Sequence, residues 1–168
     1  EMDGTDHVPD LREETDLVNC AKSVDHYDEG CWDTLLGTCR AETLTDVALS
    51  HASPKVIHYM QPHTPFVGDV TLGIKKRVED VDAVGDGLGR LYPTVKEGAL
   101  DIDLVRLAYY TNLLYAIRNI DTYLSQTDHD ERVVVTADHG EILYQHRCSH
   151  GGMNERQTRV VPWVVVRE

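Results

Sequence analysis

The sequence lacks any long apolar run. No stretch approaches the roughly 20 consecutive apolar residues that a transmembrane helix needs, and residues 1–30 contain neither the basic segment nor the apolar core of a secretory signal. We therefore expect a soluble, cytoplasmic protein with no membrane segment. A length of 168 residues, of which 41% are hydrophobic, is sufficient for one domain with a real core. We expect a single domain over residues 1–168.

Basic residues are few compared with acidic ones. The chain has 16 Lys and Arg residues against 29 Asp and Glu residues, which gives a net charge of −13. This charge repels phosphate backbones, so we expect no nucleic-acid partner. The acidity is spread along the chain and Arg is more frequent than Lys, which is typical of proteins kept soluble in high salt, where ions screen the repulsion between like charges. We expect a halophilic source.

Cysteine is also rare, and the sequence contains no internal repeat and no low-complexity tract. The four cysteines are Cys20, Cys31, Cys39 and Cys148. Their spacings match neither a CxxC pair nor the disulfide scaffold of a small secreted domain. We expect reduced thiols, as in a cytoplasm.

Hydrophobic periodicity predicts an α/β protein, in which helices and strands follow one another. The predicted helices cover residues 11–27, 41–51 and 99–125, and the predicted strands cover residues 55–60, 132–136 and 160–166, the last interrupted by Pro162. Residues 68–98 contain many glycines and few large apolar residues, which predicts an insertion or a mobile cover. We expect Tyr109, Tyr110 and Tyr115 to pack in the core from the long helix, and His58 to be a core histidine.

The most informative segment follows the predicted strand that ends at Thr136. Asp138 and His139 come directly after it, and His146 and His150 follow shortly. Open α/β sheets place ligands beyond the carboxyl ends of their strands, and carboxylate and imidazole groups are ligands that Zn²⁺ or Mn²⁺ prefers. The other interpretation is an ordinary turn, in which the aspartate begins the turn and the histidines are surface residues.

His63 is a second candidate, in a loop directly after the predicted strand at residues 55–60. Pro62 and Pro65 flank it and restrict the backbone, which would hold the imidazole in a fixed direction. A histidine presented in this way can donate a hydrogen bond to an anionic ester oxygen. The alternative is a simple turn histidine.

Taken together and in this order, these motifs resemble the C-terminal half of a sulfatase-like protein of the alkaline phosphatase superfamily. The matching elements are residues 58–66, the Tyr-rich long helix, residues 133–141, His146, His150 with Gly151, and residues 159–162. The matched region is residues 54–168, and a polar region with helices, residues 1–53, precedes it. The resemblance implies an αβα sandwich around a mixed sheet, incomplete at its N-terminus.

The resemblance implies a hydrolase or transferase that acts on sulfate or phosphate esters with a divalent metal ion, Zn, Mn, Ca or Mg. It implies that Asp138 and His139 are metal ligands, and that His63, His146 and His150 bind the anionic group of a small ester substrate. Glu141 would orient a ligand and not bind the metal itself. The metal would polarise the ester oxygen and stabilise the anion of the nucleophile.

The resemblance also implies that the catalytic nucleophile lies outside this chain. In such enzymes a Ser, Thr or modified Cys nucleophile and the remaining aspartate ligands precede the elements matched here, and residues 1–53 contain no apolar strand that ends in paired aspartates. Because the chain begins with Glu1, we expect a fragment of a longer hydrolase. One alternative is a complete, non-catalytic relative that binds an anion or a partner. Another is a plain acidic α/β domain in which His63 lies far from Asp138 and His139.

Overall fold

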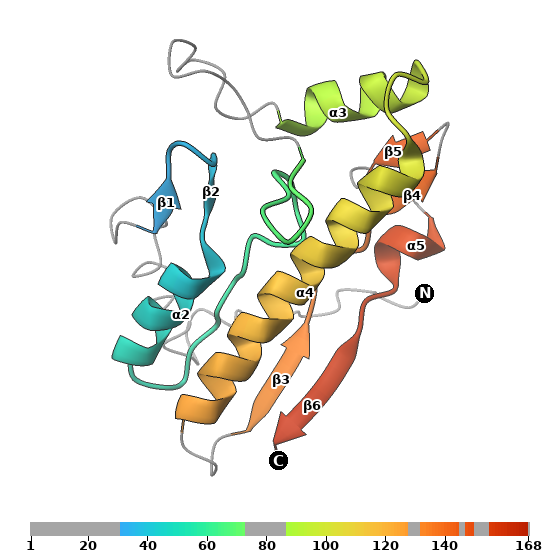
Figure 1. Ribbon diagram of the computed structural model, residues 1–168. Helices are drawn as coiled ribbons and strands as arrows, with labels where there is room; N and C mark the ends of the chain where they lie inside the picture. The colour runs from blue at the N-terminus through green and yellow to red at the C-terminus, as the bar shows by residue number, and fades with distance from the viewer. Residues whose placement is uncertain (1–30, 73–86, 128–131, 145–146, 150–154, 168) are drawn as a thin grey trace, which may run out of the picture.

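The computed structural model describes residues 31–72, 87–127, 132–144, 147–149 and 155–167. These residues form a mixed α/β structure of helices and small antiparallel sheets (Figure 1), so the expected α/β class is confirmed. The helices are α2 (Ala41–Ser50), α3 (Gly87–Lys96), α4 (Ile102–Gln126) and α5 (Arg156–Arg159), and the strands are β1 (Trp32–Asp33), β2 (Thr38–Cys39), β3 (Val133–Thr136), β4 (Ile142–Tyr144), β5 (Arg147–Ser149) and β6 (Trp163–Arg167). The helix predicted at residues 11–27 lies outside the described residues.

The long helix α4 runs diagonally through the molecule and confirms the helix predicted at residues 99–125 (Figure 1). Asp101 caps its N-terminus, because the Asp101 carboxylate accepts a hydrogen bond from the backbone N–H of Asp103 at 2.9 Å. Val105 and Ala108 are completely buried on one face. No helix in the described ranges is both long enough and apolar enough to cross a membrane.

The helix α2 packs against α4, and one tyrosine of α4 bonds to its first turn. The Tyr115 hydroxyl accepts a hydrogen bond from the backbone N–H of Ala41 at 3.2 Å and donates one to the Glu42 carboxylate. Tyr115 and Tyr109 are half-buried, in line with the expected core packing. The expectation was wrong for Tyr110, whose residue is 56% exposed because its position on α4 faces away from both α2 and the core.

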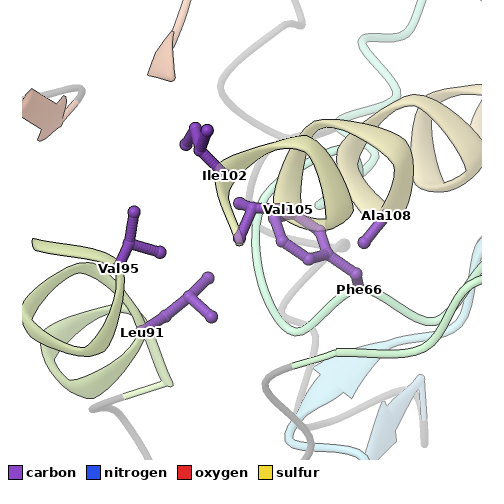
Figure 2. Packing of buried hydrophobic residues seen from close by; sticks show 6 residues of the cluster. All are labelled: Phe66, Leu91, Val95, Ile102, Val105 and Ala108. Carbon is purple, nitrogen blue, oxygen red and sulfur yellow. The ribbon is translucent and has the colours of Figure 1, made fainter. Parts of the chain in front are cut away.

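The main core gathers where α3, the N-terminal half of α4 and the loop containing Phe66 meet. Figure 2 shows its six buried residues: Phe66, Leu91, Val95, Ile102, Val105 and Ala108. Leu91 and Val95 come from α3. Residues 68–98 were expected to be an insertion or a mobile cover, and the mobile cover was wrong for α3, because two buried apolar residues one helical turn apart anchor this short helix in the core. Residues 73–86 lie outside the described part of the chain.

The strands β3 and β6 pair in antiparallel register, with Val134 opposite Val165 and Val135 opposite Val164. Strand β6 begins directly after Pro162, so the proline starts the strand and does not interrupt it. The exposed fractions of Trp163 and Val164 are 68% and 50%. Since successive residues of a strand point to opposite faces, β6 carries exposed apolar side chains on both of its faces.

The prediction of a strand at residues 55–60 was wrong. The segment is extended and its exposure alternates, but no strand of the described residues pairs with it. Ile57, Tyr59 and Met60 instead pack against a small buried cluster of Cys31, Cys39 and Leu44. The alternation therefore arises from packing on one side, without a hydrogen-bonded ladder. His58 falls on the outer side and is exposed, which corrects its interpretation as a core histidine.

Candidate functional site

Asp138 and His139 lie side by side in the loop directly after β3, at the carboxyl end of that strand. The backbone N–H of His139 donates a hydrogen bond to Asp138 Oδ1 at 3.0 Å. The second carboxylate oxygen, Oδ2, lies 3.5 Å from Nε2 of the His139 ring. The two side chains are 68% and 39% exposed, so solvent and ions can reach them. An oxygen donor and a nitrogen donor thus face each other at the surface.

The other ring nitrogen of His139 sets the tautomer. Nδ1 lies 3.0 Å from the carbonyl oxygen of Gly140, and a carbonyl oxygen only accepts hydrogen bonds, so Nδ1 carries the hydrogen atom. In the neutral imidazole the lone pair is then on Nε2, toward Asp138 Oδ2. Metal-binding histidines are commonly oriented in this way, by a backbone carbonyl that accepts from the nitrogen not bound to the metal.

The separation of the two donor atoms matches a shared metal ion. With metal–ligand bonds of about 2.1 Å and a tetrahedral angle, neighbouring ligand atoms lie about 3.4 Å apart, close to the 3.5 Å between Asp138 Oδ2 and His139 Nε2. The pair therefore fits two of the four ligands of a zinc-like site.

Gly140 fixes this loop against α5. Its backbone N–H donates a hydrogen bond to the carbonyl oxygen of Thr158 at 3.1 Å. A Cβ atom on Gly140 would overlap the carbonyl oxygen of Gln157. Only glycine allows this approach of two backbones, so the glycine holds the Asp138–His139 loop in place. The sequence showed a turn glycine here, but the neighbouring backbone comes from a distant part of the chain.

The loop that contains His63 is fixed by α4. The Nδ2 group of Asn112, a residue that is 0% exposed, donates to the carbonyl oxygen of His63 at 3.1 Å, and its Oδ1 accepts from the backbone N–H of Val67 at 3.0 Å. The His63 ring is half-buried, and its Nδ1 lies 2.6 Å from the Thr64 carbonyl oxygen. This role of Asn112 was not predicted from the sequence, because a polar residue inside a helix carries no signal of what it binds.

The same loop lies unusually close to the helix. The Thr111 hydroxyl accepts a hydrogen bond from the backbone N–H of Val70 at 3.1 Å. A Cβ atom on Gly68 would overlap the backbone of Thr111 and Asn112. A pair of adjacent polar residues on α4, Thr111 and Asn112, therefore sets the position of the whole loop.

The two candidate loops meet around Tyr109. The Phe66 ring, from the His63 loop, makes an edge-to-face contact with the Tyr109 ring, with centroids 6.2 Å apart. Burial, and to a smaller extent the negative charge of Glu141, raises the pKa of Tyr109. Leu143 of β4, two residues after Glu141, packs against the same core as Phe66. The loop after β3 and the loop around His63 therefore flank one residue of α4.

The structure does not add His63 to the Asp138–His139 pair as a third donor. Within the described ranges, no three His, Cys, Asp or Glu side chains come together as a group that could hold a metal ion. His146 and His150, the other two histidines expected at the site, lie outside the described residues. The geometry therefore supports a two-ligand half-site and gives no complete metal centre.

Comparison with known proteins identifies no relative: no protein family, no curated protein and no solved structure matches the chain. Any function assigned to it consequently depends on the chemistry of its own residues.

Proposed function

We propose that this chain supplies part of the divalent-metal centre of a sulfatase-like hydrolase or transferase that acts on small sulfate or phosphate esters. The observation that carries the proposal is the Asp138–His139 pair, with an oxygen and a nitrogen donor 3.5 Å apart at the end of β3. The Gly140 carbonyl fixes the tautomer, and the contact of Gly140 with α5 fixes the loop. These are the features of a preorganised half-site.

In this proposal the remaining histidines bind the anionic part of the substrate. With Nδ1 of His63 directed to the Thr64 carbonyl, Nε2 is the atom that donates to an ester oxygen when the ring is protonated. His146 and His150 are assigned the same task from the resemblance of the sequence alone. A bound divalent metal would supply a Lewis acid at the ester oxygen. The nucleophile and the missing ligands would come from a segment outside this chain.

The proposal includes an αβα sandwich around a mixed sheet. Its support is the apolar character of β6 on both faces, which is typical of strands covered on two sides. In that sandwich, further strands would extend the sheet of β3 and β6, and helical layers on its two faces would cover Trp163 and Val164. The cytoplasmic location and the halophilic source also belong to the proposal, and they rest on the composition of the chain.

Metal titration of the full chain tests the half-site. We expect isothermal titration with Zn²⁺ and Mn²⁺ to show binding that Asp138→Asn and His139→Ala each weaken about 10-fold or more. The matched controls are Asp121→Asn and His58→Ala, which remove an exposed carboxylate on α4 and an exposed histidine elsewhere. Equal affinity in all five proteins would place the bound metal away from Asp138 and His139 and would reject the proposal.

Turnover separates the enzyme from the non-catalytic alternative. The chain is joined to whatever sequence its gene encodes upstream, and release of nitrophenol from its sulfate and phosphate esters is followed with and without Zn²⁺ or Mn²⁺. Metal-dependent release that is lost in Asp138→Asn supports the hydrolase. Metal binding that depends on Asp138 and His139, without turnover of any ester, supports an anion- or partner-binding relative instead.

A further inference from the structure

Two cysteine thiols lie together at the end of the β1–β2 hairpin. Trp32 pairs with Cys39 across the hairpin, and Cys31 directly precedes Trp32 in the chain. Both cysteines are reduced, and both belong to one buried cluster with Leu44, with exposed fractions of 2% and 1%. Burial, followed by the charge and hydrogen bond of the Cys31 thiol, raises the pKa of Cys39 to about 12. Because Cys31 precedes the residue that pairs with Cys39, and both side chains belong to one buried cluster, the two thiols lie near each other.

Cys31 lines a hollow that the described residues form at the surface. The hollow has a volume of about 350 Å³, and its lining includes Cys31, Trp32, Leu35 and Arg40 but not Cys39. Leu35 is 69% exposed, so the hollow opens to solvent. A small molecule can approach Cys31 by this route, whereas Cys39 is not among the residues that line this hollow.

We propose that Cys31 and Cys39 form a redox-active pair that small-molecule disulfides oxidise, with Cys31 as the attacking thiol and Cys39 as the resolving thiol. The Cys31 sulfur, after losing its proton to water, attacks one sulfur of the disulfide, which forms a mixed disulfide and releases one small thiolate. The Cys39 sulfur, likewise deprotonated, attacks Cys31 in turn, forms the Cys31–Cys39 bond and releases the second thiolate. The two lost protons neutralise the two thiolates, so one disulfide is exchanged for another.

The pair is connected to the His63 loop. The Nε2 group of Gln61 donates a hydrogen bond to the carbonyl oxygen of Cys39 at 2.9 Å, and Gln61 is two residues from His63. A Cys31–Cys39 bond would tie both strands of the hairpin to each other, and Gln61 would then anchor the loop to a cross-linked support. Oxidation should accordingly raise the midpoint of thermal unfolding, and a reductant should reverse the increase.

Tryptic mapping of the oxidised full chain tests the proposal. The folded chain is first treated with 2-hydroxyethyl disulfide, an uncharged probe chosen because the protein is strongly acidic. It is then alkylated in denaturant without reductant. Residues 23–40 form one tryptic peptide that contains both Cys31 and Cys39, while Cys20 and Cys148 fall in other peptides. We expect this peptide to take up no alkyl group and to be lighter than the reduced peptide by the mass of two hydrogen atoms.

The order of attack is tested with two variants. Cys39→Ser should accumulate the mixed disulfide on Cys31, and Cys31→Ser should form an adduct on Cys39 at least about 10-fold more slowly, since Cys39 does not line the hollow. Equal rates would overturn the assigned order. If either variant fails to fold, the wild-type map still decides the pairing: a doubly alkylated peptide 23–40, or a link from it to the Cys20 or Cys148 peptide, overturns the proposal.

Discussion

Asn112, in the middle of α4, donates a hydrogen bond from Nδ2 to the backbone carbonyl of His63 at 3.1 Å. Its Oδ1 accepts a second bond from the backbone N–H of Val67, on the far side of the same loop. The residue is 0% exposed, so neither bond can be replaced by bulk water. One side chain of the long helix thus determines where the candidate anion-binding histidine stands.

We predict that Asn112→Ala lowers the free energy of unfolding by about 2–4 kcal/mol, because two buried backbone groups lose their partners. Asn119→Ala is the matched control on the same helix. Asn119 is half-buried and its side chain bonds to the Tyr115 carbonyl one turn away, so its loss should cost less than about 1 kcal/mol. Urea unfolding followed by circular dichroism measures both values. Equal values for the two variants would contradict the anchoring role of Asn112.

Gly140→Ala should destabilise the protein by about 1–3 kcal/mol, because the added methyl group meets the Gln157 carbonyl and forces the loop away from α5. It should also weaken metal binding, since it shifts Asp138 and His139 without removing a donor. Ala137→Ser, at an exposed position of the same loop, is the control and should change neither quantity. Thermal unfolding and metal titration of the two variants check this. If Gly140→Ala destabilises the protein but leaves the metal affinity unchanged, the position of this loop does not control metal binding.

Tyr115→Phe should lower the free energy of unfolding at pH 7 by about 1 kcal/mol. The Tyr115 hydroxyl takes the place of a side-chain cap on α2, whose own capping residue, Arg40, provides no such bond. Tyr123→Phe is the control, because Tyr123 is a buried tyrosine of the same helix, whereas the hydrogen bond with Ala41 is made by Tyr115. A fall in helix stability limited to Tyr115→Phe, seen as faster hydrogen exchange of residues in α2, would support the capping role.

Tyr115 should also make the folded protein less stable at alkaline pH. Burial, followed by the hydrogen bond and charge of Glu42, raises the pKa of Tyr115 well above its ordinary value of 10.0. Because the pKa is raised in the folded state, the Tyr115 hydroxyl contributes fully to the free energy of unfolding below pH 10, and this contribution is lost as the pH rises further. The stability difference between the wild type and Tyr115→Phe should therefore shrink above about pH 10. A constant difference from pH 8 to pH 11 would contradict it.

Asp33 should show the opposite dependence on pH. Its carboxylate accepts hydrogen bonds from the backbone N–H groups of Leu35 and Leu36 and from Arg40 Nε. The bond from Leu36, aided by Arg40 and opposed by burial, lowers the pKa of Asp33 below its ordinary value of 3.8. Its contribution is therefore present above pH 3.8 and is lost as the pH falls through the lower folded-state value.

We accordingly expect Asp33→Asn to be less stable than the wild type at pH 7 and to approach it below about pH 4. Asp121→Asn controls for the loss of one negative charge from a strongly acidic chain. The measurement is a series of urea unfolding curves between pH 2.5 and pH 7. A difference that widens on acidification would show that the Asp33 contacts do not stabilise the folded hairpin.

The features that could be predicted from the sequence are those with a local cause. The long helix was predicted at residues 99–125 because its apolar residues repeat along one face, and α4 spans Ile102–Gln126. Strand β3 was predicted from three consecutive valines. The predictions that failed concern segments whose structure depends on what they pack against. Residues 55–60 alternate like a strand but pack on Leu44. The hairpins β1–β2 and β4–β5 were not predicted because their strands have only two or three residues each.

The candidate site likewise has one part that the sequence predicts and another part that only the structure shows. Asp138 and His139 are adjacent in sequence, so their proximity followed from the motif, and only the 3.5 Å donor separation required the structure. The relation of His63 to that pair spans more than seventy residues, and no periodicity encodes it. Asn112 and Gly140 position the two loops. They contact backbone groups far away in the chain, so neither composition nor spacing predicts these contacts.

The two tryptophans of the chain give it a pair of built-in optical reporters. Trp163 on β6 is 68% exposed and should emit at long wavelength. Trp32 lines the hollow beside Cys31 and is half-buried. Any strand or subunit that packs against β6 will shift the Trp163 emission to shorter wavelength. The proposed Cys31–Cys39 disulfide would instead quench the emission of Trp32, which lines the same hollow as Cys31. Single replacement of each indole by phenylalanine would therefore let one fluorimeter follow assembly and thiol chemistry separately.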